Sequence, residues 1–413
     1  MNTPSPQITT SLTGMKIVTT HMLSSSVTVF IAFRAGSCFE DKQNSGIAHF
    51  LEHMFFKGGG KYPTPKSVAE AIDSVGGECN AFTSREYVCY YIKIAHEYIS
   101  LAFDVLSEMI GEAAFLEEEI EKERKVIIEE IHMYEDNPSS KVEQMFDELL
   151  YGDTVYGWDI AGTIDSVHGI TRDALLDYRD RWYRADNMVL SVAGAIDHNK
   201  IVDLAQVYFE NKISHASTQI ILPQVKYYDS ASCFEYRDLQ QAHINLGVPA
   251  CSLLDEKKYI VHMLTTILGG NMSSRMFQSL REERGLCYYV YTEHQAYLHT
   301  GAFVCSAGVD VTRIDEALNA IQQECNTIAS VGITEKELEQ AKNYIFGQTA
   351  LYLETSRSFA QYFAKRVLFY NDTLDWISLK PHYESITVDQ VQECAQELFS
   401  DQLWRVACLS SRK

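Results

Sequence analysis

Residues 48–54 read Ala-His-Phe-Leu-Glu-His-Met, and this stretch decides how the rest of the chain is interpreted. Its apolar residues and those that flank it are typical of a buried helix, so His49 and His53 share one helical face. Two imidazoles one turn apart supply half of the ligands of a tetrahedral metal site. Glu52 is close enough to accept a proton from a water at such a site. A histidine on an apolar helix is often only structural, so this stretch alone leaves metal binding open.

A second helix is predicted over residues 115–134, a segment that contains no Gly or Pro. Glu119, Glu123 and Glu130 recur there at spacings of four and seven and therefore form one stripe. Val126 and Ile127 are expected on the same side, which predicts that the acidic stripe faces inward. Carboxylates seldom face a core unless they are paired or bind a metal. The stripe is therefore the natural source of a further ligand.

The His-x-x-Glu-His order of residues 49–53 is the inverzincin signature. Together with Glu130, in the context Glu-Arg-Lys-Val-Ile-Ile-Glu-Glu, it resembles the pitrilysin/insulinase family of zinc peptidases. Within that family, the length and sequence are similar to the mitochondrial processing peptidase branch and its bacterial relatives. The resemblance implies one Zn²⁺ per chain, held by His49, His53 and Glu130, with Glu123 as a helper glutamate.

Two other residues of the second helix compete for these roles. Glu129 lies about 100° away from the acidic stripe and can pair with Lys125, so its simpler role is that of a solvated salt-bridge partner. His132 lies on yet another face and is expected to be structural.

The resemblance also implies the activity and the way in which substrate binds. The chain is expected to be a zinc-dependent endopeptidase in which Glu52 is the general base. Asn80, Ala81 and Phe82 resemble an edge strand to which an extended peptide adds itself by backbone hydrogen bonds. From the residues alone, an ordinary turn and strand at this position are about as plausible.

The second half of the chain carries its own motif in residues 273–288, which resembles the arginine–tyrosine stretch of the family. Arg281 and Tyr288 match its spacing. The resemblance implies that the arginine contacts a peptide carbonyl and that the tyrosine helps to stabilise the oxyanion. A surface helix end with a buried tyrosine is the structural alternative.

The order of predicted elements in the first half is repeated in the second. Strand, helix, glycines, helix, two strands and a helix follow residue 26, and again follow residue 243. This order predicts an α+β fold of two duplicated domains, each a mainly antiparallel sheet packed with helices, as in processing peptidases. The expected boundaries are 1–213 for the zinc domain, 214–226 for a linker and 227–413 for the second domain. Where the first copy has its histidine motif, the second has only His262, which we expect to be a core residue without zinc.

Length and composition restrict the class of protein. A chain of 413 residues is expected to form two domains. Its net charge of −21 argues against nucleic acid as a partner, since nucleic-acid binding needs basic patches. An apolar run long enough to span a membrane is missing from the sequence, and the N-terminus has neither a basic nor an apolar region. Ten scattered cysteines without a Cys-x-x-Cys pair favour a reducing compartment. A cytoplasmic location without membrane attachment is therefore expected.

Longer relatives carry four such domains that close around a peptide, whereas this chain has two. The resemblance therefore implies either a homodimer or a heterodimer with a related, metal-free subunit, in which Arg281 and Tyr288 serve the same chain or its partner. The alternative function is a non-catalytic subunit kept for assembly or peptide binding. An iron oxygenase with two histidines and one carboxylate is a more distant alternative, because it leaves Glu52 without a role.

Overall fold

The computed structural model describes residues 5–215, 225, 227–228, 231–400 and 404–412, which form two compact units. The first unit comprises Met1–Ile131, Asp159–Pro223 and Leu351–Asp375, and the second comprises His132–Trp158, Gln224–Ala350 and Trp376–Lys413. Each unit thus contains most of one predicted half together with a segment from the other half. The linker predicted at 214–226 lies largely outside the described residues.

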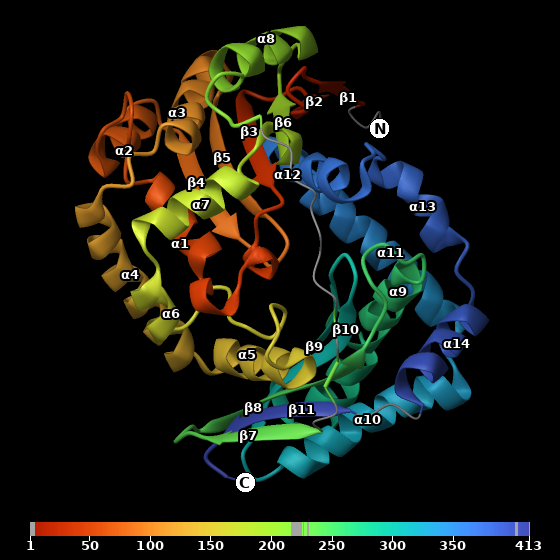
Figure 1. Cartoon of the computed structure of the whole chain (residues 1–413). Helices are drawn as coiled ribbons and strands as arrows, with labels where there is room; N and C mark the ends of the chain where they lie inside the picture. Colours follow the sequence, from red (N-terminus) through yellow and green to blue (C-terminus); the bar gives the residue numbers. More distant parts are fainter. Residues whose placement is uncertain (1–4, 216–224, 226, 229–230, 401–403, 413) are drawn as a thin grey trace. The chain divides into compact units, whose positions relative to one another are not determined.

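A six-stranded sheet with the order β1-β2-β6-β3-β5-β4 forms the centre of the first unit (Figure 1). Only the pair β2 and β6 is parallel, and every other pair is antiparallel. Successive side chains of a strand point to opposite faces, so the β-branched and aromatic residues at alternate positions of β3 fill one core. The strands are β1 (Pro6–Thr10), β2 (Lys16–His21), β3 (Ser26–Phe33), β4 (Glu78–Thr83), β5 (Val88–Ala95) and β6 (Met188–Gly194).

Helices cover both faces of this sheet. One face forms the main core with α1 (Ile47–Phe55), α2 (Pro65–Asp73), α3 (Ile99–Gly111), α4 (Glu117–Asp136), α6 (Ile164–Gly169), α7 (Arg172–Trp182) and α8 (His198–Phe209). The other face is covered by α12 (Ser356–Lys365), which comes from the far end of the chain. Thr28, which points away from the main core, is hydrogen-bonded to Ser356 over 2.9 Å.

The second unit repeats this sheet without a counterpart of β1. Its order is β7-β11-β8-β10-β9, in which β7 and β11 are parallel and the other pairs are antiparallel. The strands are β7 (Ser232–Tyr236), β8 (Gln241–Pro249), β9 (Cys287–Ala296), β10 (Gly301–Asp310) and β11 (Arg405–Ser410). The helices are α5 (Pro138–Tyr151), α9 (Lys258–Gly269), α10 (Ile314–Val331), α11 (Glu335–Tyr352), α13 (Trp376–Glu384) and α14 (Val388–Phe399).

One helix from the first half of the chain, α5, packs on the second sheet through β8 and β11. Gly247 of β8 makes this contact possible: a Cβ there would lie 2.9 Å from the Phe146 ring and 2.1 Å from the carbonyl oxygen of Phe303. Each sheet is therefore covered on one face by a helix taken from the other half of the sequence.

The predicted α+β fold of two duplicated domains is confirmed by this matching strand order. Two local predictions are wrong. Val126 is exposed, because the buried side of α4 is formed by residues such as Glu123 and Ile127. His262 is also exposed and does not belong to the core, and its Nδ1 lies 2.9 Å from the Tyr383 hydroxyl.

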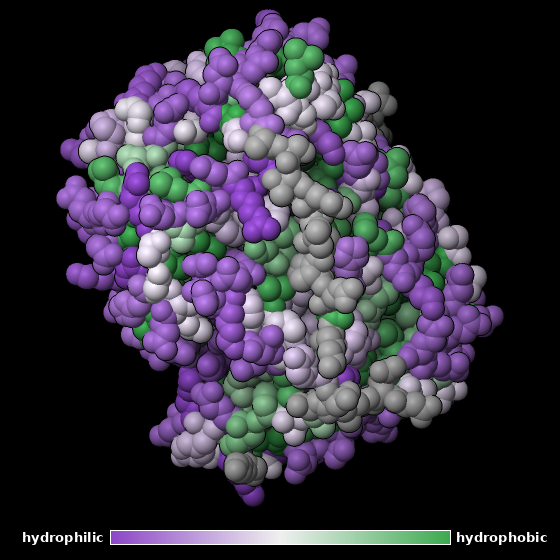
Figure 2. Space-filling view, viewed as in Figure 1, coloured by the Kyte–Doolittle hydropathy of each residue, from purple (hydrophilic) through white to green (hydrophobic). Residues whose placement is uncertain are grey.

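Hydrophilic residues dominate the visible surface of the first unit, and apolar residues appear there only in scattered patches (Figure 2). Among the described residues, none of the helices is both long enough and apolar enough to cross a membrane.

Candidate metal centre

The motif helix α1 begins in an unusual way. Its N-cap is Gly46, with φ +91°, and a Cβ there would lie 2.4 Å from the carbonyl oxygen of Ala161. Asn44 and Ser45 precede it and are residue types that commonly cap a helix, so the sequence predicts a cap from them, but that prediction is wrong. The buried Glu40 carboxylate replaces it and accepts hydrogen bonds from the backbone N–H groups of Gly46 at 2.8 Å and Ala48 at 2.9 Å. Burial raises the pKa of Glu40 to about 8, although these two donors oppose the shift.

The two motif histidines meet the carboxylate of Glu130 on α4. His49 Nε2 and His53 Nε2 lie 3.2 Å apart, and Glu130 Oε2 lies 3.7 Å from the first and 3.4 Å from the second. These residues are the one group of three or more His, Cys, Asp or Glu side chains, among those described, that could hold a metal ion.

The donor atoms fit a tetrahedral zinc ion. Zinc lies about 2.0–2.2 Å from nitrogen and oxygen ligands, which places the ligand atoms of a tetrahedron about 3.3–3.5 Å from one another. The three separations of 3.2, 3.4 and 3.7 Å match this edge length closely. Two imidazoles and one carboxylate are also the set that leaves one position of a catalytic zinc ion open.

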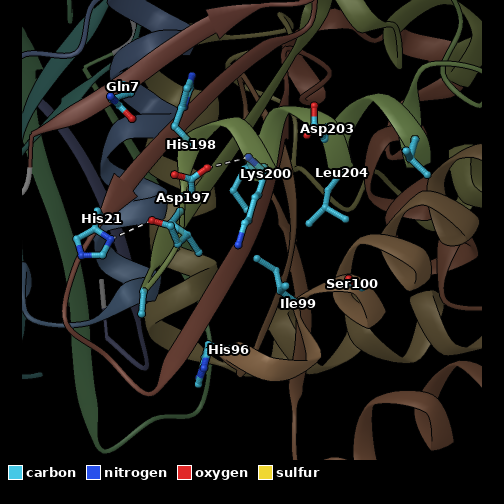
Figure 3. Close-up of a pocket in the computed structure, with 14 residues that line it drawn as sticks. Gln7, His21, His96, Ile99, Ser100, Asp197, His198, Lys200, Asp203 and Leu204 are labelled. Carbon is cyan, nitrogen blue, oxygen red and sulfur yellow. Dashed lines mark hydrogen bonds between the residues drawn. The ribbon is translucent and has the colours of Figure 1, made fainter.

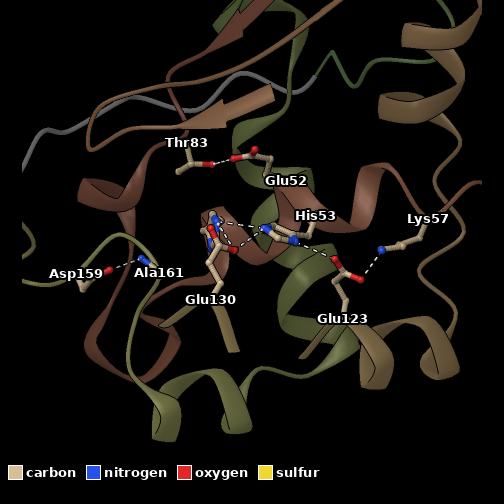
Figure 4. A network of polar contacts seen from close by, with 9 residues as sticks. Glu52, His53, Lys57, Thr83, Glu123, Glu130, Asp159 and Ala161 are labelled. Carbon is tan, nitrogen blue, oxygen red and sulfur yellow. Dashed lines mark hydrogen bonds and ion pairs between the residues drawn. The ribbon is translucent and has the colours of Figure 1, made fainter. Parts of the chain in front are cut away.

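A network of charged groups orients His53 (Figure 4). Its Nδ1 lies 2.8 Å from Glu123 Oε1, and Glu123 Oε2 is ion-paired with Lys57. The hydrogen bond between His53 and Glu123 directs Nε2 of His53 toward Glu130 and His49. His49 has no such support, since its buried Nδ1 has no hydrogen-bond partner among the described residues.

Several charged groups surround the cluster. Glu52, Glu123 and Glu130 lie near the two histidines, and Lys57 is ion-paired with Glu123. Burial lowers the pKa of His53, but hydrogen bonds to Glu123 and Glu130 outweigh it and raise the value to about 9. Burial and the charge of His53 lower the pKa of His49 to about 4. The raised pKa favours the protonated form of His53, and binding of a metal ion, which needs the neutral imidazole, would release that proton.

Glu52 lies beside the cluster and contacts the edge strand β4. Thr83 Oγ1 donates a hydrogen bond to Glu52 Oε2 over 2.5 Å. Burial raises the pKa of Glu52, while the hydrogen bond from Thr83 and the nearby His53 lower it. The hydrogen bond from Thr83 thus engages Oε2 of this carboxylate and not Oε1.

The remaining candidates on α4 lie away from the cluster. Glu129 is exposed, in line with the solvated role expected for it, and His132, which was expected to be structural, is also exposed. Glu119 is partly buried and ion-paired with Lys122 at 2.5 Å.

The predicted substrate strand, Asn80 to Phe82, lies within β4 at the open edge of the first sheet. Ala81 N donates a hydrogen bond to the side-chain oxygen of Asn80 over 2.8 Å, so this donor does not bond to β5. The Phe82 ring packs edge-on against Tyr87, with ring centroids 5.4 Å apart.

Arg281 and Tyr288 lie together in the second unit. The Arg281 guanidinium lies 5.6 Å from the centre of the Tyr288 ring and 4.7 Å from the centre of the Phe277 ring. Tyr288, near the start of β9, is 71% exposed. The buried tyrosine considered as an alternative is therefore wrong.

Three residues that support the site were not predicted from the sequence: Glu40, which caps α1, and Lys57 and Thr83, which contact Glu123 and Glu52. Glu40 and Lys57 flank the histidine motif within nine residues, and Thr83 follows the predicted Asn80 to Phe82 strand directly. Nearness to the motif was the available signal, but their partners depend on tertiary contacts.

The first unit has a groove with a volume of about 970 Å³ between α8 and the start of α3 (Figure 3). His21, His96 and Lys200 line it together with the apolar residues Ile99, Leu204 and Val207. None of the predicted site residues lines this groove, so it is separate from the metal cluster.

Comparison with protein families gives two matches. The family described as Insulinase (Peptidase family M16) matches residues 16–164, and that described as Peptidase M16 inactive domain matches residues 169–345. An uncharacterized zinc protease of Bacillus subtilis is 34% identical over 378 residues, which cover 91% of this chain and 91% of that protein. An uncharacterized zinc protease of Streptomyces coelicolor is 33% identical over 392 residues, covering 93% of this chain and 85% of that protein.

Solved structures share the fold. A protease from Helicobacter pylori has a TM-score of 0.91 at 21% identity, covering 99% of this chain and 100% of that one. A putative M16-like peptidase from Alicyclobacillus acidocaldarius has a TM-score of 0.86 at 21% identity, covering 99% of both chains.

Proposed function

The chain belongs to the insulinase family, peptidase family M16, and from this we propose that it is a zinc-dependent endopeptidase acting on unstructured peptides. The observation that carries the proposal is the convergence of His49, His53 and Glu130 at tetrahedral spacing beside Glu52. The two relatives described above are both named zinc proteases, which supports zinc as the metal. The narrower resemblance to the processing peptidase branch stays a prediction.

His49, His53 and Glu130 would hold the metal. When bound, Zn²⁺ lowers the pKa of water toward neutrality and polarises the carbonyl of the scissile bond. Glu123 would keep the proton of His53 on Nδ1, so that Nε2 offers a lone pair. Lys57 balances the charge of Glu123 and holds its second oxygen.

Glu52 would transfer the protons. One of its oxygens is held by Thr83, which leaves Oε1 free to accept a proton from the attacking water. Cleavage of the peptide bond then needs a proton on the leaving amine, and the same carboxyl group can deliver it. Burial favours this exchange, because it raises the pKa of Glu52 from that of an ordinary carboxylate.

The open edge of β4 would bind the peptide. An extended chain that pairs with this strand is held by backbone hydrogen bonds, which give affinity with little preference for side chains. To pair with Ala81, it must displace the Asn80 side chain from the Ala81 N–H. Asn80 therefore keeps this donor satisfied until substrate arrives.

Arg281 and Tyr288 would contact the substrate from the second domain. The exposed Tyr288 offers a hydroxyl donor, and the partly buried Arg281, which lies over its ring, offers guanidinium donors. We also propose that the chain works as a homodimer or as a heterodimer with a related subunit. A monomeric mass measured under conditions of full activity would contradict both assemblies.

We further propose that the protein is located in the cytoplasm. Its ten free cysteines support a reducing compartment.

A non-catalytic subunit for assembly or peptide binding is the second candidate function. The match of residues 169–345 to a family described as an inactive domain favours it for that part of the chain. Residues 16–164 match the other description and contain the metal cluster and Glu52, which favours catalysis.

The test is hydrolysis of a mixed set of short unstructured peptides by the purified protein, with Glu52→Gln compared at matched zinc content. We expect cleavage by the wild type and almost none by the variant. Glu129→Gln is the matched control, since it makes the same chemical change at an exposed position of α4. If wild type and Glu52→Gln both retain zinc and neither cleaves any peptide, the isolated chain is either one half of a heterodimeric enzyme or a non-catalytic subunit, and the homodimeric peptidase is ruled out.

A further inference from the structure

Thr83 joins the strand that is open to substrate with the carboxylate proposed as general base. Its hydroxyl donates to Glu52 Oε2 over 2.5 Å, a length typical of a strong hydrogen bond from a hydroxyl to a carboxylate (Figure 4). Thr83 is the last residue of β4, and α1, which carries Glu52, packs against this strand. Glu52 is therefore oriented by a strand residue that lies 31 positions away in the sequence.

The backbone of the same residue faces the open edge. In an antiparallel pair, residues that exchange backbone hydrogen bonds alternate with residues whose N–H and C=O point outward. Ser84 N donates to Tyr87 O over 2.9 Å, so the next pair, Thr83 with Val88, is of the outward-facing kind. Ala81 has the same orientation, because its N–H bonds to the Asn80 side chain and not to β5. Thr83 thus presents its N–H and C=O to an added strand and its hydroxyl to Glu52.

We propose that Thr83 is a positioning residue that couples the addition of a peptide at β4 to the orientation of Glu52. This inference rests on the proposed function. A peptide that pairs with Thr83 fixes its backbone, and the fixed hydroxyl then holds the carboxylate with Oε1 directed to the proton that it accepts. A peptide that reaches the metal without pairing at Thr83 meets a carboxylate that is less well oriented. The arrangement therefore selects extended substrates at the chemical step as well as at binding.

Two substitutions separate the hydroxyl from the rest of the side chain. Thr83→Val keeps the size and β-branching and removes the donor. Thr83→Ser keeps the donor and removes the methyl group. Thr20→Val is the matched control: Thr20 lies in the same sheet, and its buried hydroxyl has no hydrogen-bond partner among the described residues.

The experiment measures kcat and KM of peptide hydrolysis for these variants, together with zinc affinity by competition with a chelator. We expect Thr83→Val to lower kcat by about ten- to hundredfold, the effect of losing a hydrogen bond to a charged group. KM and zinc affinity should change by less than about threefold. Thr83→Ser should recover most of kcat, and Thr20→Val should match the wild type. An unchanged kcat in Thr83→Val, an equal loss in Thr83→Ser, or a parallel loss of zinc affinity would overturn the proposal.

A second readout needs no activity and keeps this inference separate from the proposed function. Crystal structures of metal-free wild type and Thr83→Val are compared for the orientation of the Glu52 carboxylate. We expect it to turn or become disordered in the variant, and an unchanged orientation would refute the role of Thr83. Failure of the wild type to cleave any peptide would count against the proposed function, while the crystal comparison would still decide whether the hydroxyl orients Glu52.

Discussion

His53 Nδ1 and Glu123 Oε1 lie 2.8 Å apart, and the second oxygen of this carboxylate is ion-paired with Lys57. The three side chains form a chain of contacts in which the lysine restrains the glutamate and the glutamate orients the imidazole. Lys57 therefore acts on the metal site without being a ligand.

Lys57→Met should weaken zinc binding by about tenfold, the lower end of the range for losing a partner that orients a ligand. Glu123 would lose the charge that fixes its Oε2, and the hydrogen bond to His53 would loosen. Chelator competition measures the change. Lys125→Met, at an exposed position of α4, is the control and should bind zinc like the wild type. Equal affinity in the two variants would contradict the role of Lys57.

Glu130→Gln should lower the zinc affinity more than Lys57→Met does, and by more than the roughly 10- to 100-fold that follows loss of a residue that only orients a ligand. The amide keeps the shape of the side chain but removes the negative charge that attracts the cation. Zinc content after dialysis, measured by atomic absorption, tests this expectation, and Glu129→Gln should retain the metal. If Glu129→Gln loses zinc and Glu130→Gln retains it, the two glutamates have been assigned the wrong roles.

A third prediction concerns Glu337 in the second unit, which is hydrogen-bonded to Arg275 at 2.6 Å and to the Thr334 backbone N–H at 2.8 Å. Burial alone would raise the pKa of Glu337, but these contacts outweigh it and lower the value to about 2. Because the pKa of Glu337 is lower in the folded protein, its carboxylate stabilises the fold at pH values above the unfolded-state pKa, near 4.5. This contribution is lost as the pH falls toward 2.

Glu337→Gln should therefore lower the free energy of unfolding by about 1–2 kcal/mol at pH 7, a figure reduced for solvent screening of this partly exposed pair. The difference from the wild type should shrink steadily between pH 5 and pH 2. Urea unfolding at several pH values measures it. A difference that is the same at pH 7 and pH 3 would show that the charge of Glu337 is not responsible.

Gly247→Ala tests the close packing of β8 against the neighbouring strand β10 and against α5. A methyl group there meets the Phe303 carbonyl at 2.1 Å and the Phe146 ring at 2.9 Å, so the variant should be destabilised by roughly 1–3 kcal/mol or more. Gly347→Ala is the control, because its Cβ would meet nothing within 4 Å on α11. Thermal unfolding should show a lower midpoint for the first variant only, and an unchanged midpoint in Gly247→Ala would contradict the close approach of α5.

The sequence predicts the parts of the site that depend on helical spacing. His49, Glu52 and His53 follow from one turn of an apolar helix, and the resemblance supplied Glu130, which the structure brings to the histidines. Lys57 could not be predicted, because its partner lies on another helix and nothing local indicates which carboxylate it meets.

The order of strands and helices along the chain was predictable, but the sheet on which each helix packs was not. The pattern of residues 356–365 is typical of an amphipathic helix, and such a pattern does not say which sheet the helix covers. The error at Val126 has a similar origin. Successive residues of an α-helix are rotated by about 100° from each other, so of two neighbouring apolar residues one can be buried while the other faces solvent. The cap of α1 was wrong because Glu40, six residues before Gly46, replaces a local side chain.

The position of α12 also matters while the protein is being made. Strands β2, β3 and β6 have all been synthesised by Gly194, yet the helix that covers their second face begins only at Ser356. At typical rates of translation, the ribosome needs roughly ten to thirty seconds to make the intervening segment. During this time α12 does not yet exist, so the complete covering of the second face of the first sheet can form only after synthesis has passed Lys365.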